Sequence, residues 1–254
     1  MKKQIILCMF IFTSFYLSSC YRIAFSKVGA FQKSASPIKI SNAKKDVVFI
    51  PMHHVGKKEF YDDVKRIADS LQNLGYVFYY EAVKISPVKD SLSADTLRRK
   101  MRKVIGNDVF SAKVNGGYID TVNHTFLHKK LKIIRKENLV NQPPFIRMNI
   151  DTAKGRWGDA YLSDMIPAFE KKFGNIALSD CDFSTALDAK YKCSKHKGKE
   201  EKNFLLVEYR NECVATKMMN NPDDKIAVIY GAMHFDGVLK MLQQYDSTWK
   251  KTDP

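Results

Sequence analysis

Two histidines and one glutamate stand where predicted strands end, so their side chains could act together. His54 and His234 each follow a short β-branched run, and Glu81 follows an aromatic one. Two neutral imidazoles and a carboxylate make a suitable ligand set for a divalent transition metal, with positions left for water and substrate. Such a metal lowers the pKa of its water and polarises a carbonyl group. These residue types therefore predict metal-dependent hydrolysis.

The elements that would position these residues are readable from the pattern of apolar side chains. Residues 47–50 form a buried-strand run, which Pro51 should end because proline has no N–H for the sheet. Apolar residues at helical spacing follow as far as Gly75, a suitable helix terminator, and a second strand covers 76–80. A helical crossover makes the two strands parallel, so their ends should meet at one sheet edge. The run 225–230 repeats the strand pattern before the second histidine.

The N-terminus has the layout of an export signal. Lys2 and Lys3 precede an apolar run that is too short to span a membrane. The run ends in Leu17-Ser18-Ser19-Cys20, which resembles the site where lipoprotein signal peptidase cuts before a lipidated cysteine. We therefore predict a signal peptide at 1–19 and a lipid such as palmitate on Cys20. A plain secretory signal or an N-terminal anchor helix is the alternative.

The remaining chain is predicted to be one domain on a lipid-anchored tether. Residues 20–45 contain Pro37 and lack clear periodicity, so we interpret them as the tether. Residues 46–250 are enough for a single α/β domain with a sizeable core. We expect a mixed central sheet flanked by helices, held to a bacterial membrane in the cell envelope.

The formal net charge of +15 is concentrated in two basic clusters, Arg98–Lys103 and Lys129–Lys136. In a cytoplasmic protein this would favour nucleic-acid binding. Export argues against a nucleic-acid partner and favours attraction to acidic lipid headgroups. The alternative is that both clusters are simply solvated surface.

Two further patterns bear on chemistry. After removal of the signal and lipidation of Cys20, the remaining cysteines are Cys181, Cys193 and Cys213, so at most one pair can close. Cys181 and Cys193 would tie a short lysine-rich loop in an oxidising compartment. His124 and His128 have the spacing of a zinc-protease helix, but a threonine stands where the catalytic glutamate would be.

Four segments together carry a resemblance to a known family. They are FIPMHHVG, YYEAV, EYRNECVATKM and IYGAMHFDGVLKML, in that order along the chain. The combination resembles the TraB/PrgY/GumN family, which includes the Tiki metalloproteases and is grouped with ChaN- and EreA-like proteins. The resemblance implies His54, Glu81 and His234 as metal ligands, Glu81 and Arg210 as catalytic, and Asp159 and Asn211 in support. Pro51 departs from the glycine that the family has there.

The resemblance implies a metal-dependent peptidase acting on a peptide or small molecule. Manganese or cobalt is the metal that it suggests, with zinc or iron as further options. Arg210 could hold a substrate carboxylate or an oxyanion, because its planar group pairs with carboxylates in a bidentate way. One alternative is a non-catalytic lipoprotein that binds haem, iron or a small ligand. Another is a basic envelope module whose site has decayed.

Overall fold

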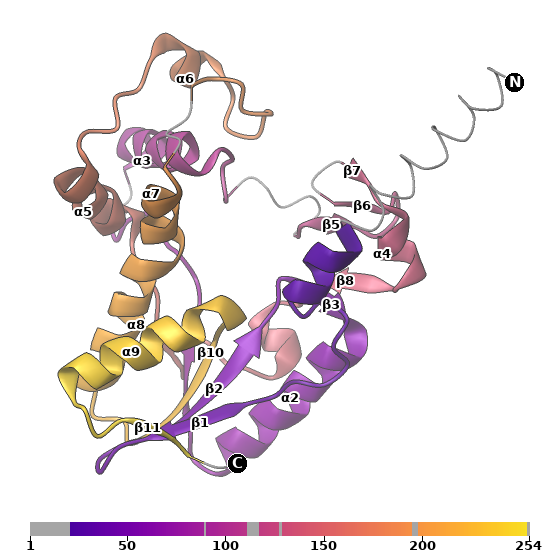
Figure 1. Cartoon of the computed structure of the whole chain (residues 1–254), viewed down its shortest axis with the longest axis vertical. Coiled ribbons are helices and arrows are strands. Elements are labelled where there is room, and N and C mark those ends of the chain that lie inside the picture. The colour runs from indigo at the N-terminus through magenta and orange to yellow at the C-terminus, as the bar shows by residue number, and fades with distance from the viewer. Residues whose placement is uncertain (1–20, 89, 111–116, 127–128, 195–197, 253–254) are drawn as a thin grey trace, which may run out of the picture.

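A six-stranded mixed sheet forms the centre of the fold (Figure 1). The computed structural model describes residues 21–88, 90–110, 117–126, 129–194 and 198–252. The strand order is β11-β1-β2-β10-β4-β9, with β2, β10, β4 and β9 parallel and β1 antiparallel to both of its neighbours. The strands are β1 (Ile38–Ser41), β2 (Asp46–Met52), β4 (Val77–Tyr80), β9 (Arg156–Trp157), β10 (Lys225–Gly231) and β11 (Lys250–Thr252).

The three strands that lead to the candidate residues are adjacent and aligned. Ile229 of β10 pairs with Ile50 of β2 on one side and with Tyr80 of β4 on the other. The predicted parallel arrangement of these strands is therefore confirmed. Their carboxyl ends meet at one edge of the sheet, and the chain leaves each strand there toward the candidate side chains.

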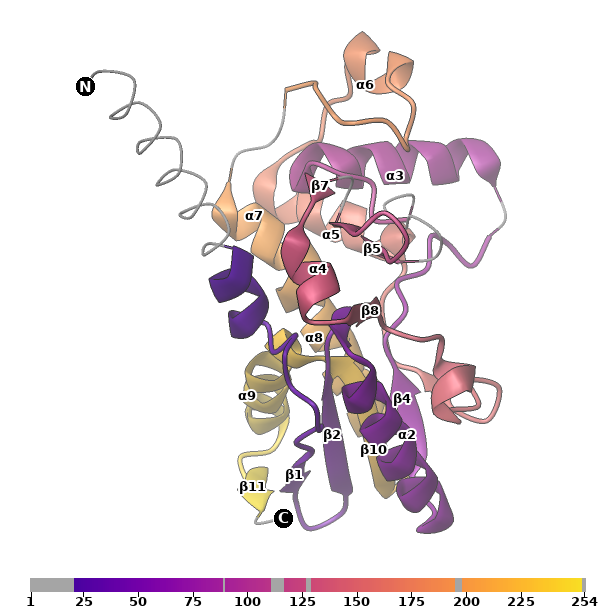
Figure 2. The same cartoon turned by 90° about the vertical axis from the view of Figure 1, so that its right-hand side faces the viewer.

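Helices cover both faces of the sheet (Figures 1 and 2). Helix α2 (Lys58–Asn73) packs on one face through apolar residues spaced three and four apart. Helices α8 (Tyr209–Asn220) and α9 (Phe235–Tyr245) cover the other face. The predicted class, an α/β fold with a mixed sheet flanked by helices, is confirmed, and α2 ends two residues before Gly75 as expected.

Two groups of elements lie beyond the carboxyl edge of the sheet (Figure 1). A helical layer shares its own apolar core, built from α3 (Ser91–Ile105), α5 (Leu162–Phe173) and η2 (Phe204–Glu208), with α6 (Asp180–Ser184) and α7 (Lys199–Asn203) beside it. A small lobe packs the helical segment 21–27 against β5 (Ile119–Asp120), β6 (Thr125–Phe126), β7 (Lys129–Lys130) and α4 (Lys132–Lys136). Strands β3 (Val55–Lys57) and β8 (Leu139–Asn141) join this lobe to the sheet, and two short 3-10 turns are η1 (Phe145–Met148) and η3 (Ala232–His234).

The predicted tether at residues 20–45 is wrong for most of its length. Phe25 and Ala30 are buried in the small lobe, and β1 is a strand of the central sheet with Ile40 fully buried. These few apolar residues are too widely spaced in the sequence to show a helical or strand period. They nevertheless pack into the core of the small lobe and of the central sheet. The fold therefore includes the described residues from 21 onward, and it continues past residue 250 through β11.

Pro51 does not end its strand, because β2 continues to Met52. Strand β1 pairs with β2 only as far as Phe49, so the end of β2 is an edge on that side. Proline is tolerated at such an edge, where no ladder hydrogen bond is lost. His124 lies in a turn with a φ of +54° instead of a helix, and His128 lies outside the described residues.

The predicted disulfide between Cys181 and Cys193 is present, and Cys213 is free. The signal peptide and Cys20 lie outside the described residues. Among the described helices, none has the length and apolar character needed to cross a membrane.

Truncation of a buried side chain in β1 tests whether this segment belongs to the fold. We expect Ile40→Ala to lower the free energy of unfolding by about 2–5 kcal/mol, because a fully buried side chain is replaced by a cavity. Ile23→Ala is the matched control, since Ile23 is 57% exposed and should change stability by less than about 0.5 kcal/mol. Urea unfolding followed by circular dichroism measures both, and equal stabilities would restore the tether interpretation.

Candidate active site

Glu81 lies at the centre of the candidate site, between β4 and β10. Its backbone N–H donates to the carbonyl of Ile229 (3.2 Å), which continues the β4–β10 ladder. Its Oε2 accepts a hydrogen bond of 2.6 Å from the backbone N–H of Gly231. A Cβ atom at position 231 would lie 3.3 Å from that same oxygen and from the His234 ring, so glycine allows this close approach. The carboxylate is thus fixed at the end of the central strand.

Arg210 joins Glu81 to Asp159. Its Nε and Nη2 donate to the two oxygens of Asp159 (2.9 and 2.7 Å), and Nη2 also donates to Oε1 of Glu81 (2.5 Å). Its Nη1 donates to the carbonyl of Leu206 (3.3 Å), within the π-helical turn η2 that precedes α8. Four of the five guanidinium N–H groups are therefore used inside the protein. This geometry assigns Arg210 to holding Glu81 in place, and it differs from the predicted direct contact with substrate.

The network keeps both partners charged despite their burial. Burial alone would raise the pKa of Glu81, but its electrostatic interaction with Arg210, followed by those with His234 and His54, outweighs burial and lowers the pKa. Burial alone would lower the pKa of Arg210, but Tyr230, Glu81 and Asp159 together hold it well above its ordinary value. Removing one partner from such a buried group leaves an uncompensated charge, which is strongly destabilising.

His234 is buried and held by Asn211. Its Nδ1 lies 2.7 Å from Oδ1 of Asn211, and its ring packs edge-on against Tyr230. An amide oxygen can only accept, so Nδ1 carries the proton and Nε2 keeps its lone pair. Burial, followed by the charge of Arg210, lowers the pKa of His234 to about 4. A Cβ at Gly237 of α9 would lie 2.0 Å from the Asn211 amide, so this arrangement requires glycine there.

His54 is the exposed member of the group and faces the small lobe. Its Nδ1 lies 3.3 Å from Oε1 of Gln142, whose backbone N–H also donates to the His54 carbonyl (2.9 Å). The Tyr118 ring lies 5.2 Å from the His54 ring, and His54 interacts electrostatically with Glu81. His53 points elsewhere: it is buried against Phe60 and hydrogen bonds to Gln32.

Tyr118 and Gln142 are site residues that the sequence analysis did not find. Burial, followed by the negative charge of Glu81, raises the pKa of Tyr118, so its hydroxyl stays protonated at neutral pH. Both residues come from the middle of the chain, where no strand-end pattern or helical period marks them. Only the pairing of β8 with β3 brings Gln142 to the end of β2.

The described residues do not assemble the predicted three-ligand metal site. No group of three or more His, Cys, Asp or Glu side chains among them is placed to hold a metal ion. Both oxygens of Glu81 are engaged by Arg210 and Gly231, and a cation at Oε1 would be next to the guanidinium charge. The structure thus brings Glu81, Arg210, Asp159, Asn211 and His234 into contact and His54 to the same edge, without forming the metal site.

Comparison of the chain with family models, with curated proteins and with solved structures finds no match. The likeness to the TraB/PrgY/GumN family stays a resemblance carried by the four sequence segments.

The lowered pKa of His234 makes stability depend on pH in a defined direction. An unfolded histidine titrates near its ordinary pKa of 6.5, whereas the folded one titrates at about 4, so the unfolded state binds more protons between these values. This contribution is therefore complete above pH 6.5 and is lost as the pH falls toward 4. We expect wild type to lose about 2–3 kcal/mol more than His234→Asn between neutral pH and about pH 4.5. Urea unfolding at the two pH values measures this difference, and equal losses in both proteins would contradict the buried neutral state.

Proposed function

We propose that this chain is a hydrolase of ester or amide bonds in which His54 is the general base. The observation that carries the proposal is the meeting, at three adjacent strand ends, of an exposed imidazole, an ionised carboxylate and a buried neutral imidazole. The stability of the fold does not explain this combination, because a strand can end without a buried ion pair and without two oriented histidines.

His54 has the accessibility and orientation that a general base needs. Its Nδ1 faces the Gln142 amide oxygen, which leaves the Nε2 lone pair available to take a proton from water. The imidazolium that forms is stabilised by the negative charge of Glu81, which its lowered pKa keeps ionised. Glu81 itself is a poor base, since both of its oxygens already accept hydrogen bonds.

Tyr118 is suited to stabilise the negative charge that develops on the attacked carbonyl. Its raised pKa keeps the O–H proton in place as a hydrogen-bond donor, and its ring lies beside His54. Because the Tyr118 ring is held next to His54, its hydroxyl can donate to the carbonyl oxygen of the group that the activated water attacks. Arg210 and Asp159 act through Glu81, and Asn211 acts through His234, so these three are positioning residues.

A metal-dependent form of this hydrolase is the second candidate. It is supported by the hydrogen bonds that turn both histidines so that each Nε2 is free, an arrangement common around metal ligands. Manganese or cobalt stays the metal implied by the resemblance. Glu81 would have to give up its hydrogen bond from Arg210 or from Gly231 to serve as a full ligand.

The same proposal places the protein in the cell envelope with a peptide-like substrate. The disulfide between Cys181 and Cys193 supports an oxidising compartment, in agreement with an export signal before Cys20. The choice of a peptide over another acyl substrate comes from the resemblance to Tiki-like peptidases.

Substitution of the three strand-end residues tests the hydrolase. We expect His54→Ala to lower kcat/KM by about 10²–10⁴-fold on a panel of peptide and aryl-ester substrates, since a general base is lost. Glu81→Gln and Tyr118→Phe should each cost about 10²-fold, through the lost charge and the lost donor. His124→Asn is the control, because His124 lies in the β5–β6 turn with a positive φ that asparagine accepts. If wild type is inactive on the whole panel, the non-catalytic binding alternative replaces this proposal.

Chelation and metal addition separate the two candidate mechanisms. We expect protein stripped with EDTA to keep its activity, and its melting temperature to stay within about one degree on addition of manganese, cobalt, zinc or iron. Specific binding to the folded state would instead raise the melting temperature. A rise that disappears in His54→Ala/His234→Ala, together with activity restored by the same ion, would establish the metal-dependent form.

A further inference from the structure

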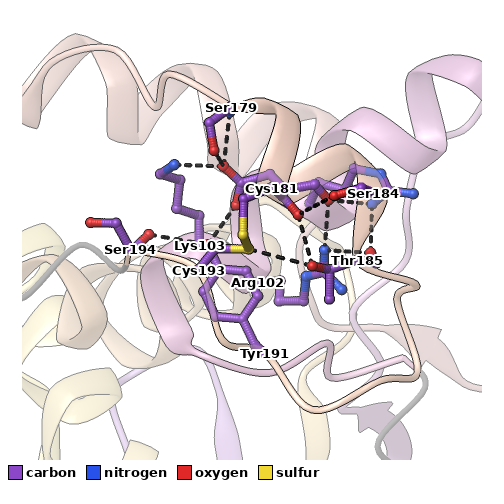
Figure 3. Close-up of polar contacts among 11 residues, drawn as sticks. Arg102, Lys103, Ser179, Cys181, Ser184, Thr185, Tyr191, Cys193 and Ser194 are labelled. Atoms are coloured by element: carbon purple, nitrogen blue, oxygen red, sulfur yellow. Dashed lines mark hydrogen bonds and ion pairs between the residues drawn. A yellow bond between two sulfur atoms is a disulfide. The ribbon is translucent and has the colours of Figure 1, made fainter.

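The two basic clusters of the sequence have different environments in the structure. In Arg98–Lys103, every cation is engaged inside the helical layer (Figure 3 shows Arg102 and Lys103). Arg98 pairs with Asp108, Lys100 with Glu170 and Lys103 with Asp182. Arg99 and Arg102 donate to backbone carbonyls at the end of α6, next to the disulfide. This cluster therefore holds α6 on α3 and offers little charge to a partner.

The second cluster remains exposed on the small lobe. Lys132, Arg135 and Lys136 of α4 are solvent-exposed, as are Lys130 of β7 and Lys27 of the helical segment 21–27. None of these five has an ion pair within the part of the chain that the structure describes. The segments 21–35 and 117–138 together contain eight lysines and arginines but only Asp120 and Glu137 as acids.

Both acids of the lobe are already occupied. Glu137 accepts from Arg22 (3.1 Å) and Lys57 (3.1 Å), and Asp120 accepts from the backbone of its own turn and from Asn123. Within the described residues, the five exposed cations therefore repel one another without a carboxylate paired to any of them. An external anionic surface would stabilise them most.

Exposed apolar side chains lie in the same lobe. Ile23 and Val28, at the N-terminal segment, are 57% and 59% exposed, and Val122 in the β5–β6 turn is 83% exposed. The segment packs against this hairpin through Phe25, whose ring meets Phe126 edge-on at 5.4 Å. A lobe that exposes both cations and apolar side chains has the composition that binds at a lipid–water interface.

We propose that the small lobe docks on an anionic phospholipid surface. The docking surface consists of Lys27, Lys130, Lys132, Arg135 and Lys136, with Ile23, Val28 and Val122 as apolar contacts. The position of the lobe agrees with this partner, because the helical segment 21–27, which packs in the lobe, directly follows in sequence the cysteine predicted to carry lipid. Because no flexible tether separates Cys20 from the helical segment 21–27, a lipid on Cys20 would hold this lobe close to the membrane. This last argument rests on the proposed lipoprotein assignment, whereas the charge and exposure arguments do not.

Docking would also place the candidate site near the membrane. Tyr118 and Gln142, which contact His54, come from the chain that forms the lobe and its junction with the sheet. A substrate carried on or near the membrane surface could then approach His54 from the side of the lobe.

Vesicle binding by the unlipidated chain from residue 21 onward tests the surface itself. This chain contains all the described core, so it retains the fold. We expect it to sediment with phosphatidylcholine vesicles containing about one third phosphatidylglycerol, but not with pure phosphatidylcholine, and to dissociate at high salt. Lys132→Glu/Arg135→Glu/Lys136→Glu should weaken binding by about tenfold or more. Lys190→Glu/Lys192→Glu/Lys199→Glu, equal in charge but on the helical layer side, is the matched control and should bind nearly as well as wild type.

Three outcomes would overturn the proposal. The first is no binding to the anionic vesicles, and the second is an equal loss in both triple variants, which would show only a net-charge effect. The third is binding of wild type to a DNA fragment but not to vesicles, with DNA binding lost in Lys132→Glu/Arg135→Glu/Lys136→Glu, which would identify a nucleic-acid surface.

A further variant tests the apolar contacts. Ile23→Ser/Val122→Ser should lower vesicle binding, whereas any binding to the DNA fragment should be the same as that of wild type. Hydrolysis of a soluble substrate by the α4 triple is measured in parallel and should be unchanged, so failure of this surface is distinguishable from failure of the hydrolase.

Discussion

The bidentate ion pair between Arg210 and Asp159, extended to Glu81, is the constraint on which the candidate site depends. Three buried or nearly buried charges are stable only if each keeps its partners, so the elements that carry them must stay in register. Arg210 comes from the start of α8, Asp159 from the chain after β9 and Glu81 from the end of β4. The network therefore fastens the start of α8 to the chain that follows β4 and β9, at the edge of the sheet to which His54 and His234 also belong.

The same network has an electrostatic consequence for His234. The cationic guanidinium of Arg210 adds to burial in keeping that imidazole neutral, and together they outweigh the opposite effect of the anionic Glu81. His234 is enclosed and oriented by Asn211, whereas His54 is exposed. Two histidines that look equivalent in the sequence acquire different properties from their burial.

Much of this site could be predicted because it lies on regular elements close to strand ends. The β-branched runs before His54 and His234, and the helix between His54 and Glu81, fix a parallel arrangement that brings the three residues to one edge. Tyr118 and Gln142 could not be predicted, since short irregular strands place them and no period marks such strands. The role of β1 was missed for a related reason: four residues with one fully buried side chain give too weak a pattern. Arg210 was predicted as a site residue, but the sequence did not show that its guanidinium group would turn toward a protein carboxylate. Two of its N–H groups donate to Asp159, so they are not available to a substrate.

Charge along the sequence was similarly a poor guide to charge on the surface. Both basic clusters contain five lysines and arginines, yet α3 packs against α5 and α6, which present carboxylates and helix-end carbonyls to it. Among the described residues, no carboxylate forms an ion pair with the cations of α4, and Glu137 beside it pairs with Arg22 and Lys57. The difference arises from which neighbours the fold supplies. The first cluster is engaged in ion pairs and hydrogen bonds within the helical layer, and the second is exposed. The second cluster shares its lobe with Tyr118, whose ring lies 5.2 Å from that of His54, so the elements that expose these cations also hold a residue of the candidate site.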